Sequence, residues 1–131
     1  MRIGAAFERL GYKLANTRQS WSAANDHGVC LALRKQQFGR QNGLLYYDFF
    51  ERHPDRLNHM DRFGHRERAV NIATALREYD GRVDVVMVSA ASGDGAGDAE
   101  PWDVKSRGGF WQVTNFDPSD GYFRAEVVRK K

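Results

Sequence analysis

The sequence predicts an α+β domain in which a mixed, curled sheet of about five strands, or a partial barrel, carries two to three flanking helices. Three observations predict this class. Strand-like runs occur at 29–33, 44–50 and 83–88, a helical repeat occupies 66–79, and two further strand-like runs surround a turn near the end of the chain. A chain of 131 residues has the length of one domain, so we expect residues 1–131 to form a single unit.

The first third of the chain predicts a short helix followed by a hairpin. Residues 5–10 favour a helix, and Gly11 ends it because glycine readily adopts the left-handed conformation that closes helices. After a turn at 25–28, the runs 29–34 and 44–50 are rich in strand-forming residues, with glycines between them. We expect these two runs to pair as a hairpin.

A longer helix is predicted in the middle of the chain. Ala69, Ile72, Ala73 and Leu76 have the spacing of one helix face, and Asp80-Gly81 provides a stop signal. The helix is therefore expected over 66–79.

The last third predicts more sheet. A short β-branched strand is expected at 83–88, and an exposed loop at 89–101, where small, acidic and glycine residues concentrate. A final hairpin is expected from 110–114 and 122–128, around the turn at 117–121.

The charged residues are dominated by arginine. The chain has 15 Arg and 5 Lys, with a formal net charge of +3. Arginine suits two-pronged contact with phosphate, although it also pairs with protein carboxylates. The single cysteine, Cys30, cannot form a disulfide within the chain, and its apolar strand predicts a buried small side chain.

The beginning of the chain does not resemble a targeting signal. Glu8 and Arg9 stand where a signal peptide needs an apolar run, and no apolar stretch approaches the roughly 20 residues of a membrane span. We therefore expect a cytoplasmic location and no membrane partner.

Three histidines recur every six residues at His53, His59 and His65. Metal-binding histidines on a helix are usually four residues apart, whereas a spacing of six places them on different sides. We expect solvated histidines, and neither a metal nor another cofactor.

Asp84, followed by Asp103 and Lys105, has the order of acidic and basic residues found in metal-dependent nucleases. In such a site the carboxylates hold Mg²⁺ and the lysine stabilises developing charge. A Mg²⁺-dependent nuclease is therefore an enzymatic alternative.

Aromatic and basic residues predict nucleic-acid contact. Trp21 and Arg18 would line the site, where Asn16, Asn25 or Asp26 could contact the edge of a base. Phosphate contacts would come from an arginine-rich stretch that comprises Arg52, Arg56, Arg62, Arg66 and Arg68.

The segment 11–23, Gly-Tyr-x-Leu-x-Asn-x-Arg-x-Ser-Trp-Ser-Ala, precedes an apolar strand. It resembles small bacterial PUA-like domains of the EVE and ASCH types. This resemblance implies a mixed barrel flanked by helices, with a pocket for nucleic acid and in some cases for a modified base.

The predicted function is that of a non-enzymatic nucleic-acid-binding domain, a reader of DNA or of a modified base in a defence or modification context. An alternative is a protein-interaction module, encoded by a phage or mobile element, that inhibits a host nuclease. Exposed aromatic and arginine side chains would then be interface anchors.

Overall fold

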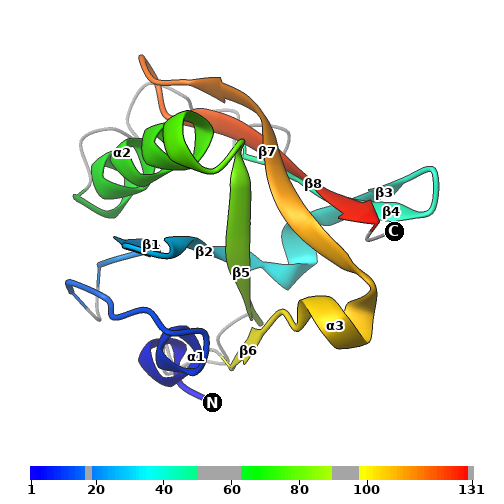
Figure 1. The fold of residues 1–131 in the computed structure, drawn as a ribbon, viewed down its shortest axis with the longest axis horizontal. Helices are drawn as coiled ribbons and strands as arrows, with labels where there is room; N and C mark the ends of the chain where they lie inside the picture. Colours follow the sequence, from blue (N-terminus) through cyan, green and yellow to red (C-terminus); the bar gives the residue numbers. More distant parts are fainter. Residues whose placement is uncertain (17–18, 50–62, 90–97, 130–131) are drawn as a thin grey trace.

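The computed structural model describes residues 1–16, 19–49, 63–89 and 98–129. In this part of the chain it contains one mixed sheet of eight strands, three α-helices and a short 3₁₀ turn (Figure 1). The elements in chain order are α1 (Ile3–Arg9), β1 (Ser22–Asn25), β2 (Gly28–Arg34), η1 (Lys35–Gln37), β3 (Phe38–Gln41), β4 (Leu44–Asp48), α2 (Phe63–Glu78), β5 (Arg82–Val88), β6 (Ala99–Pro101), α3 (Val104–Arg107), β7 (Gly109–Asp117) and β8 (Tyr122–Arg129).

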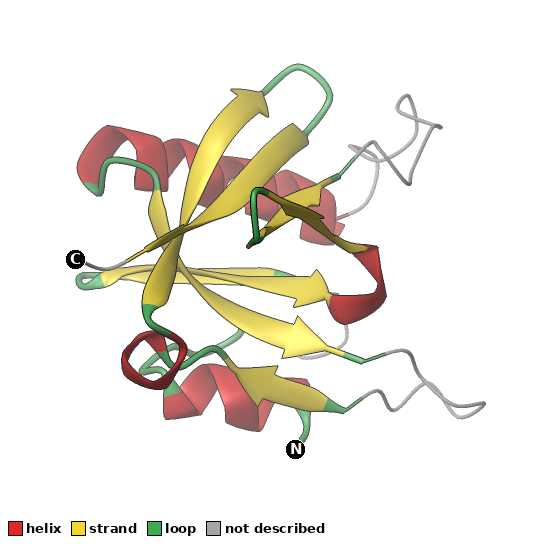
Figure 2. Ribbon diagram, turned by 90° about the vertical axis from the view of Figure 1, so that its right-hand side faces the viewer, coloured by secondary structure: helices red, strands yellow, loops and turns green. Residues whose placement is uncertain are grey.

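The sheet follows the order β1-β2-β5-β7-β8-β4-β3, with β6 paired to β5. The β2–β5 pair is parallel, and the other pairs are antiparallel. β5 joins the two halves of the sheet, because one part of it pairs with β2 and its beginning pairs with β7. The sheet is strongly curled (Figure 2). The α+β class and the mixed sheet are thus confirmed, whereas the expected number of about five strands is wrong, because the described residues form eight.

The hairpin predicted from the runs 29–34 and 44–50 is wrong. The first run forms β2, which lies between β1 and β5. The second run begins β4, which lies between β3 and β8. β2 pairs locally with β1, and β4 pairs locally with β3. The sequence pattern shows neither β1 nor β3 clearly, so the two runs were expected to pair with each other.

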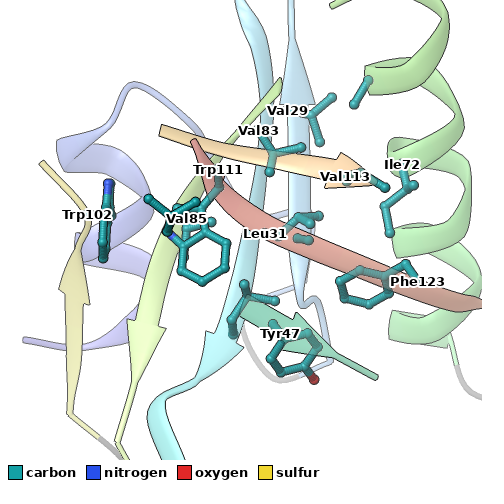
Figure 3. Close-up of a cluster of buried hydrophobic side chains, with 14 of the residues drawn as sticks. Val29, Leu31, Tyr47, Ile72, Val83, Val85, Trp102, Trp111, Val113 and Phe123 are labelled. Carbon is teal, nitrogen blue, oxygen red and sulfur yellow. The ribbon is translucent and has the colours of Figure 1, made fainter. Parts of the chain in front are cut away.

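The main core fills the concave side of the curled sheet. Trp111 and Phe123 are fully buried there, together with Leu31 of β2 and Val85 of β5 (Figure 3). α2 packs against β1, β2, β5 and β7 and contributes Ile72 to this core. Side chains from both halves of the sheet therefore share one apolar interior.

A second apolar cluster lies beneath α1, on the other side of β2 and β5. It contains Phe7 of α1, Tyr12, Cys30 and Val86. Because this cluster covers the second face of β2, six of the seven β2 residues are buried. The buried Cys30 that the sequence predicts is confirmed.

The helix predicted over 66–79 is confirmed, and Ala69 and Ile72 are buried as expected, but the buried face is rotated away from Leu76. Its buried positions are Gly64, Arg68, Ala69, Ile72 and Ala75, whereas Leu76 is exposed. Asp80 and Gly81 both have positive φ angles, as their stop signal predicts. Among the described residues, no helix is long and apolar enough to span a membrane.

Candidate nucleic-acid interface

Trp21 lies half-buried between β2 and the first turn of α2. The guanidinium carbon of Arg34 is 5.1 Å from the centre of its ring. A Cβ atom added to Gly64 would lie 2.6 Å from Trp21 Cδ1 and would overlap the carbonyl oxygen of Gln19. The structure thus brings Trp21 to the start of α2, but Arg34 and the helix already contact the ring.

Asn16 and Asn25 stabilise turns. Oδ1 of Asn16 accepts a 3.3 Å hydrogen bond from the backbone of Gln19. Oδ1 of Asn25 accepts hydrogen bonds from the backbone of His27 and Gly28, and its Nδ2 donates to the carbonyl of Gly11. The side chain of Asn25 is therefore engaged within the chain at both of its polar atoms.

The two described arginines of the predicted phosphate-binding stretch differ in exposure. Arg66 is exposed, whereas Arg68 is only 4% exposed. The Arg68 guanidinium carbon lies 4.3 Å from the ring centre of Phe49 and 4.8 Å from that of Phe123. Burial lowers the pKa of Arg68 to about 10.

Arg68 is buried because it occupies the same face of α2 as Gly64, Ile72 and Ala75. Its Nη2 donates to Nδ1 of His65 at 2.9 Å. The structure therefore does not place Arg68 on the surface, where the sequence suggests a phosphate contact. The other predicted site arginines, Arg18, Arg52, Arg56 and Arg62, lie outside the described residues.

His53 and His59 also lie outside the described residues, and His65 packs against the ring of Phe49 at 5.5 Å. No group of three or more His, Cys, Asp or Glu side chains that could hold a metal occurs in the described part of the chain.

The three residues of the nuclease alternative have structural contacts. Asp84 accepts a hydrogen bond from the hydroxyl of Tyr12, on the side of the sheet that α1 covers. Asp103 caps α3, because its Oδ1 accepts from the backbone nitrogen of Lys105 at 3.0 Å. Asp84 and Asp103 thus hold different elements in place.

A different surface gathers aromatic and basic side chains on the outer side of β5, β7, β8, β4 and β3. The register aligns one row across these five strands, and that row is Arg82, Gln112, Glu126, Tyr46 and Gly39. Phe110 and Arg124 flank this row on β7 and β8. We call this surface the strand face. In Figure 1, β3 and β4 lie on the right, away from α1 and α2, and β8 runs from beside α2 towards them.

These side chains point outward because the neighbouring positions point inward. Trp111, Phe123, Ala125 and Val127 are in the core, so period-two alternation places Phe110, Arg124 and Glu126 on the opposite side.

Arg124 connects the side chains of the strand face. Its guanidinium carbon lies 4.0 Å from the ring centre of Tyr46, and its Nη2 donates to Gln41 Oε1 at 2.9 Å. Its Nε lies 3.5 Å from Glu126 Oε2, and its Nη1 lies 3.4 Å from Asp48 Oδ2. Arg124 is thus shared between two carboxylates on this surface.

A second arginine–ring pair lies on the same surface, where the guanidinium carbon of Arg82 is 4.5 Å from the ring centre of Phe110. Arg40, Arg82 and Arg129 are exposed and have no carboxylate within ion-pair distance among the described residues. Of these three cations, Arg82 lies on the strand face, whereas alternation places Arg40 on the side of Phe38 and Arg129 on the side of Val127. A bound anion could therefore contact Arg82 on the face itself and the other two arginines at its margin.

The Tyr46 ring packs directly against the backbone of Gly39. A Cβ atom at position 39 would collide with that ring, which lies directly over the glycine. Backbone on one side and the Arg124 guanidinium on the other hold Tyr46 in a fixed position.

A half-open pocket adjoins Tyr46 at the β3–β4 hairpin. Its volume is about 180 Å³, and its lining includes Leu44, Leu45, Tyr46 and Val127, with Gln41 and Glu126 as polar groups. Arg129 approaches the hairpin turn, where its Nη2 would lie 4.0 Å from a Cβ atom at Gly43. A cation is thus near the mouth of the pocket.

No family model, curated protein or solved structure matches the chain. The resemblance to PUA-like domains therefore stays a prediction.

The strand face was not predicted from the sequence, although the chain contains a signal for it. In 122–128, apolar residues alternate with Arg124 and Glu126, which is typical of a strand with one solvated side. The alternation could have identified these two residues as solvated. It could not have identified their neighbours on β4 and β5, because a local sequence pattern does not show which strands lie side by side in the sheet.

Proposed function

We propose that this chain binds single-stranded nucleic acid on the strand face. The observation that carries the proposal is the pair of arginine–ring stacks on one sheet surface, Arg124 on Tyr46 and Arg82 on Phe110. Nucleobases stack on aromatic rings and also on the planes of arginine guanidinium groups. A base of any type can therefore stack on either arginine–ring pair, so this contact does not depend on the nucleotide sequence.

The charges of the strand face favour a polyanion. Arg40, Arg82 and Arg129 have no carboxylate partner among the described residues, whereas Glu126 and Asp48 already contact Arg124. If three phosphates of a single strand are contacted, a plot of the logarithm of the binding constant against the logarithm of the salt concentration should have a slope of about −2.

The shape of the surface favours a single strand over a duplex. The major groove of DNA admits a helix or a two-stranded ribbon. A surface that extends across five neighbouring strands is too broad to enter it, whereas a single strand can lie across such a surface with its bases unstacked.

The test is fluorescence-anisotropy binding of labelled single-stranded and duplex DNA and RNA at two salt concentrations. We expect the single strands to bind more tightly and their affinity to fall as salt rises. A lack of binding at low salt would overturn the proposal and favour the protein-interaction alternative, which a pull-down that survives nuclease treatment would support.

Variants locate the binding surface. Phe110→Leu and Arg82→Gln should each weaken binding, the first by roughly 1 kcal/mol or more because stacking is lost. The matched controls are Phe63→Leu and Arg77→Gln, both exposed on α2, and these should bind as the wild type does. Trp21→Leu is a further variant, because β1 lies at the opposite end of the sheet from β3. If only this variant loses binding, the site is at Trp21.

A further inference from the structure

The pocket at the β3–β4 hairpin has the size of a site for one ring system. Pockets that bury drug-sized ligands typically have roughly 300–1,000 Å³. A volume of about 180 Å³ is smaller and suits a single base whose sugar and phosphate remain outside. Leu44, Leu45 and Val127 supply apolar walls, and the side chain of Tyr46, whose ring faces are covered by Gly39 and Arg124, completes the lining.

Two polar groups of the pocket retain hydrogen-bonding capacity. Glu126 contacts Arg124 through Oε2, and Gln41 accepts from Arg124 through its Oε1. Within the described residues, Glu126 Oε1 and the Gln41 side-chain nitrogen have no hydrogen-bond partner. These two groups thus offer one anionic acceptor and one amide donor, beside Asn42, which also lines the pocket.

Arg124 holds these two groups close together. One guanidinium group contacts both side chains at the same time, at 2.9 Å and 3.5 Å, and also covers the Tyr46 ring. A ligand edge that matches them must therefore carry donors and an acceptor side by side.

We propose that this pocket binds one guanine base, with the Glu126 carboxylate accepting from N1–H and the N2 amino group and the Gln41 amide donating to O6. Among the common neutral bases, guanine alone places two adjacent donors opposite a carboxylate. Adenine and cytosine each offer one amino group next to an acceptor nitrogen, and uracil and thymine offer a single ring N–H. Arg129, near the hairpin turn, is placed to contact the attached phosphate. The inference rests on the proposed function and names the base that the strand face selects.

The first experiment compares labelled single-stranded oligonucleotides that differ in one central base, which is guanine, hypoxanthine, adenine, cytosine or uracil. We expect the guanine strand to bind about tenfold more tightly than the adenine, cytosine and uracil strands. Hypoxanthine lacks the N2 amino group, so that strand should bind with intermediate affinity. Equal affinity for all five strands would overturn the inference and leave the proposed function intact.

Glu126→Gln tests the role of the carboxylate. The substitution keeps the size of a partly exposed side chain, and it should abolish the guanine preference. The matched control is Glu78→Gln, exposed on α2, which should keep the preference. A preference that survives Glu126→Gln would overturn the assignment of this residue.

Titration of the full chain with guanosine and adenosine monophosphates, followed by NMR, separates the two proposals. Shifts at the β3–β4 hairpin with the guanosine nucleotide alone support the pocket even if no oligonucleotide binds, a result that would overturn the proposed function only. If neither mononucleotide shifts these residues and no base is preferred in the oligonucleotides, the pocket inference is wrong.

Discussion

The hydroxyl group of Tyr12 donates a 2.6 Å hydrogen bond to Oδ2 of Asp84 and thereby ties the segment after α1 to β5. Tyr12 itself is buried, whereas Asp84 is partly exposed. Burial, and then the bond to Asp84, raise the pKa of Tyr12 well above its ordinary value of 10.0.

Tyr12→Phe should reduce stability at neutral pH. The variant removes the donor and leaves the Asp84 carboxylate without this partner, so we expect a loss of about 1–2 kcal/mol in the free energy of unfolding. Chemical denaturation followed by circular dichroism measures it. A loss below roughly 0.5 kcal/mol would mean that water replaces the bond at no cost.

The same residue predicts a dependence on pH. The raised pKa of Tyr12 means that the folded chain keeps a proton which the unfolded chain releases above pH 10. Its contribution is therefore complete below pH 10 and is lost as pH rises beyond that value. Below about pH 10 the stabilities of wild type and Tyr12→Phe should run parallel, and above it wild type should lose stability more steeply. Parallel losses would contradict the prediction, and the comparison cancels the opposite effect of Arg68, whose pKa is lowered.

Arg68→Met should leave the free energy of unfolding unchanged or raise it by up to about 2 kcal/mol. Among the described residues no carboxylate pairs with Arg68, so its burial carries a desolvation cost. Methionine can fill the space between Phe49 and Phe123 without that cost. Oligonucleotide affinity should stay the same. A marked loss of stability would show that the cation–ring contacts outweigh desolvation, and Arg68→Ala provides the contrast, because it leaves a cavity.

Gly39→Ala should destabilise the β3–β4 hairpin by about 1–3 kcal/mol, because the added Cβ collides with the Tyr46 ring. Alanine otherwise suits a strand better than glycine. In a Tyr46→Leu background the cost should therefore largely disappear. A double-mutant cycle measures the coupling, and additive losses would exclude this contact as the cause.

Gly64→Ala should also destabilise the protein, by about 1–3 kcal/mol, although alanine is the better helix former. Its Cβ would overlap the carbonyl oxygen of Gln19, a backbone atom that cannot rotate away. Val70→Ala, at a position of α2 that is 66% exposed, is the control and should change thermal stability little. A stable Gly64→Ala variant would mean that α2 can shift away from Trp21.

Elements with a strong local pattern were predictable from the sequence. α2, β2, β5 and the β7–β8 hairpin have clear periods or stop signals, and the structure contains all of them. β1, β3 and β6 were not foreseen, because three or four residues give too short a pattern and their pairing depends on neighbours distant in sequence.

The candidate site was less predictable than the fold, for two physical reasons. Arg68 stands in a charged stretch, but the side of α2 that faces the core is decided by packing against Phe49 and Phe123. Tyr46 and Arg124 are far apart in sequence, and only the pairing of β4 with β8 brings them together. Neither the packing of α2 nor the pairing of β4 with β8 can be predicted from the local amino-acid composition.

The central position of β5 has a consequence for how the chain reaches its native state. Its partner β2 comes early in the sequence, so their parallel pairing must close a loop that contains β3, β4 and α2. β4 in turn pairs with β8, which comes last among the described strands. A topology with so many distant contacts is expected to fold slowly, and during synthesis the sheet cannot close before β8 leaves the ribosome.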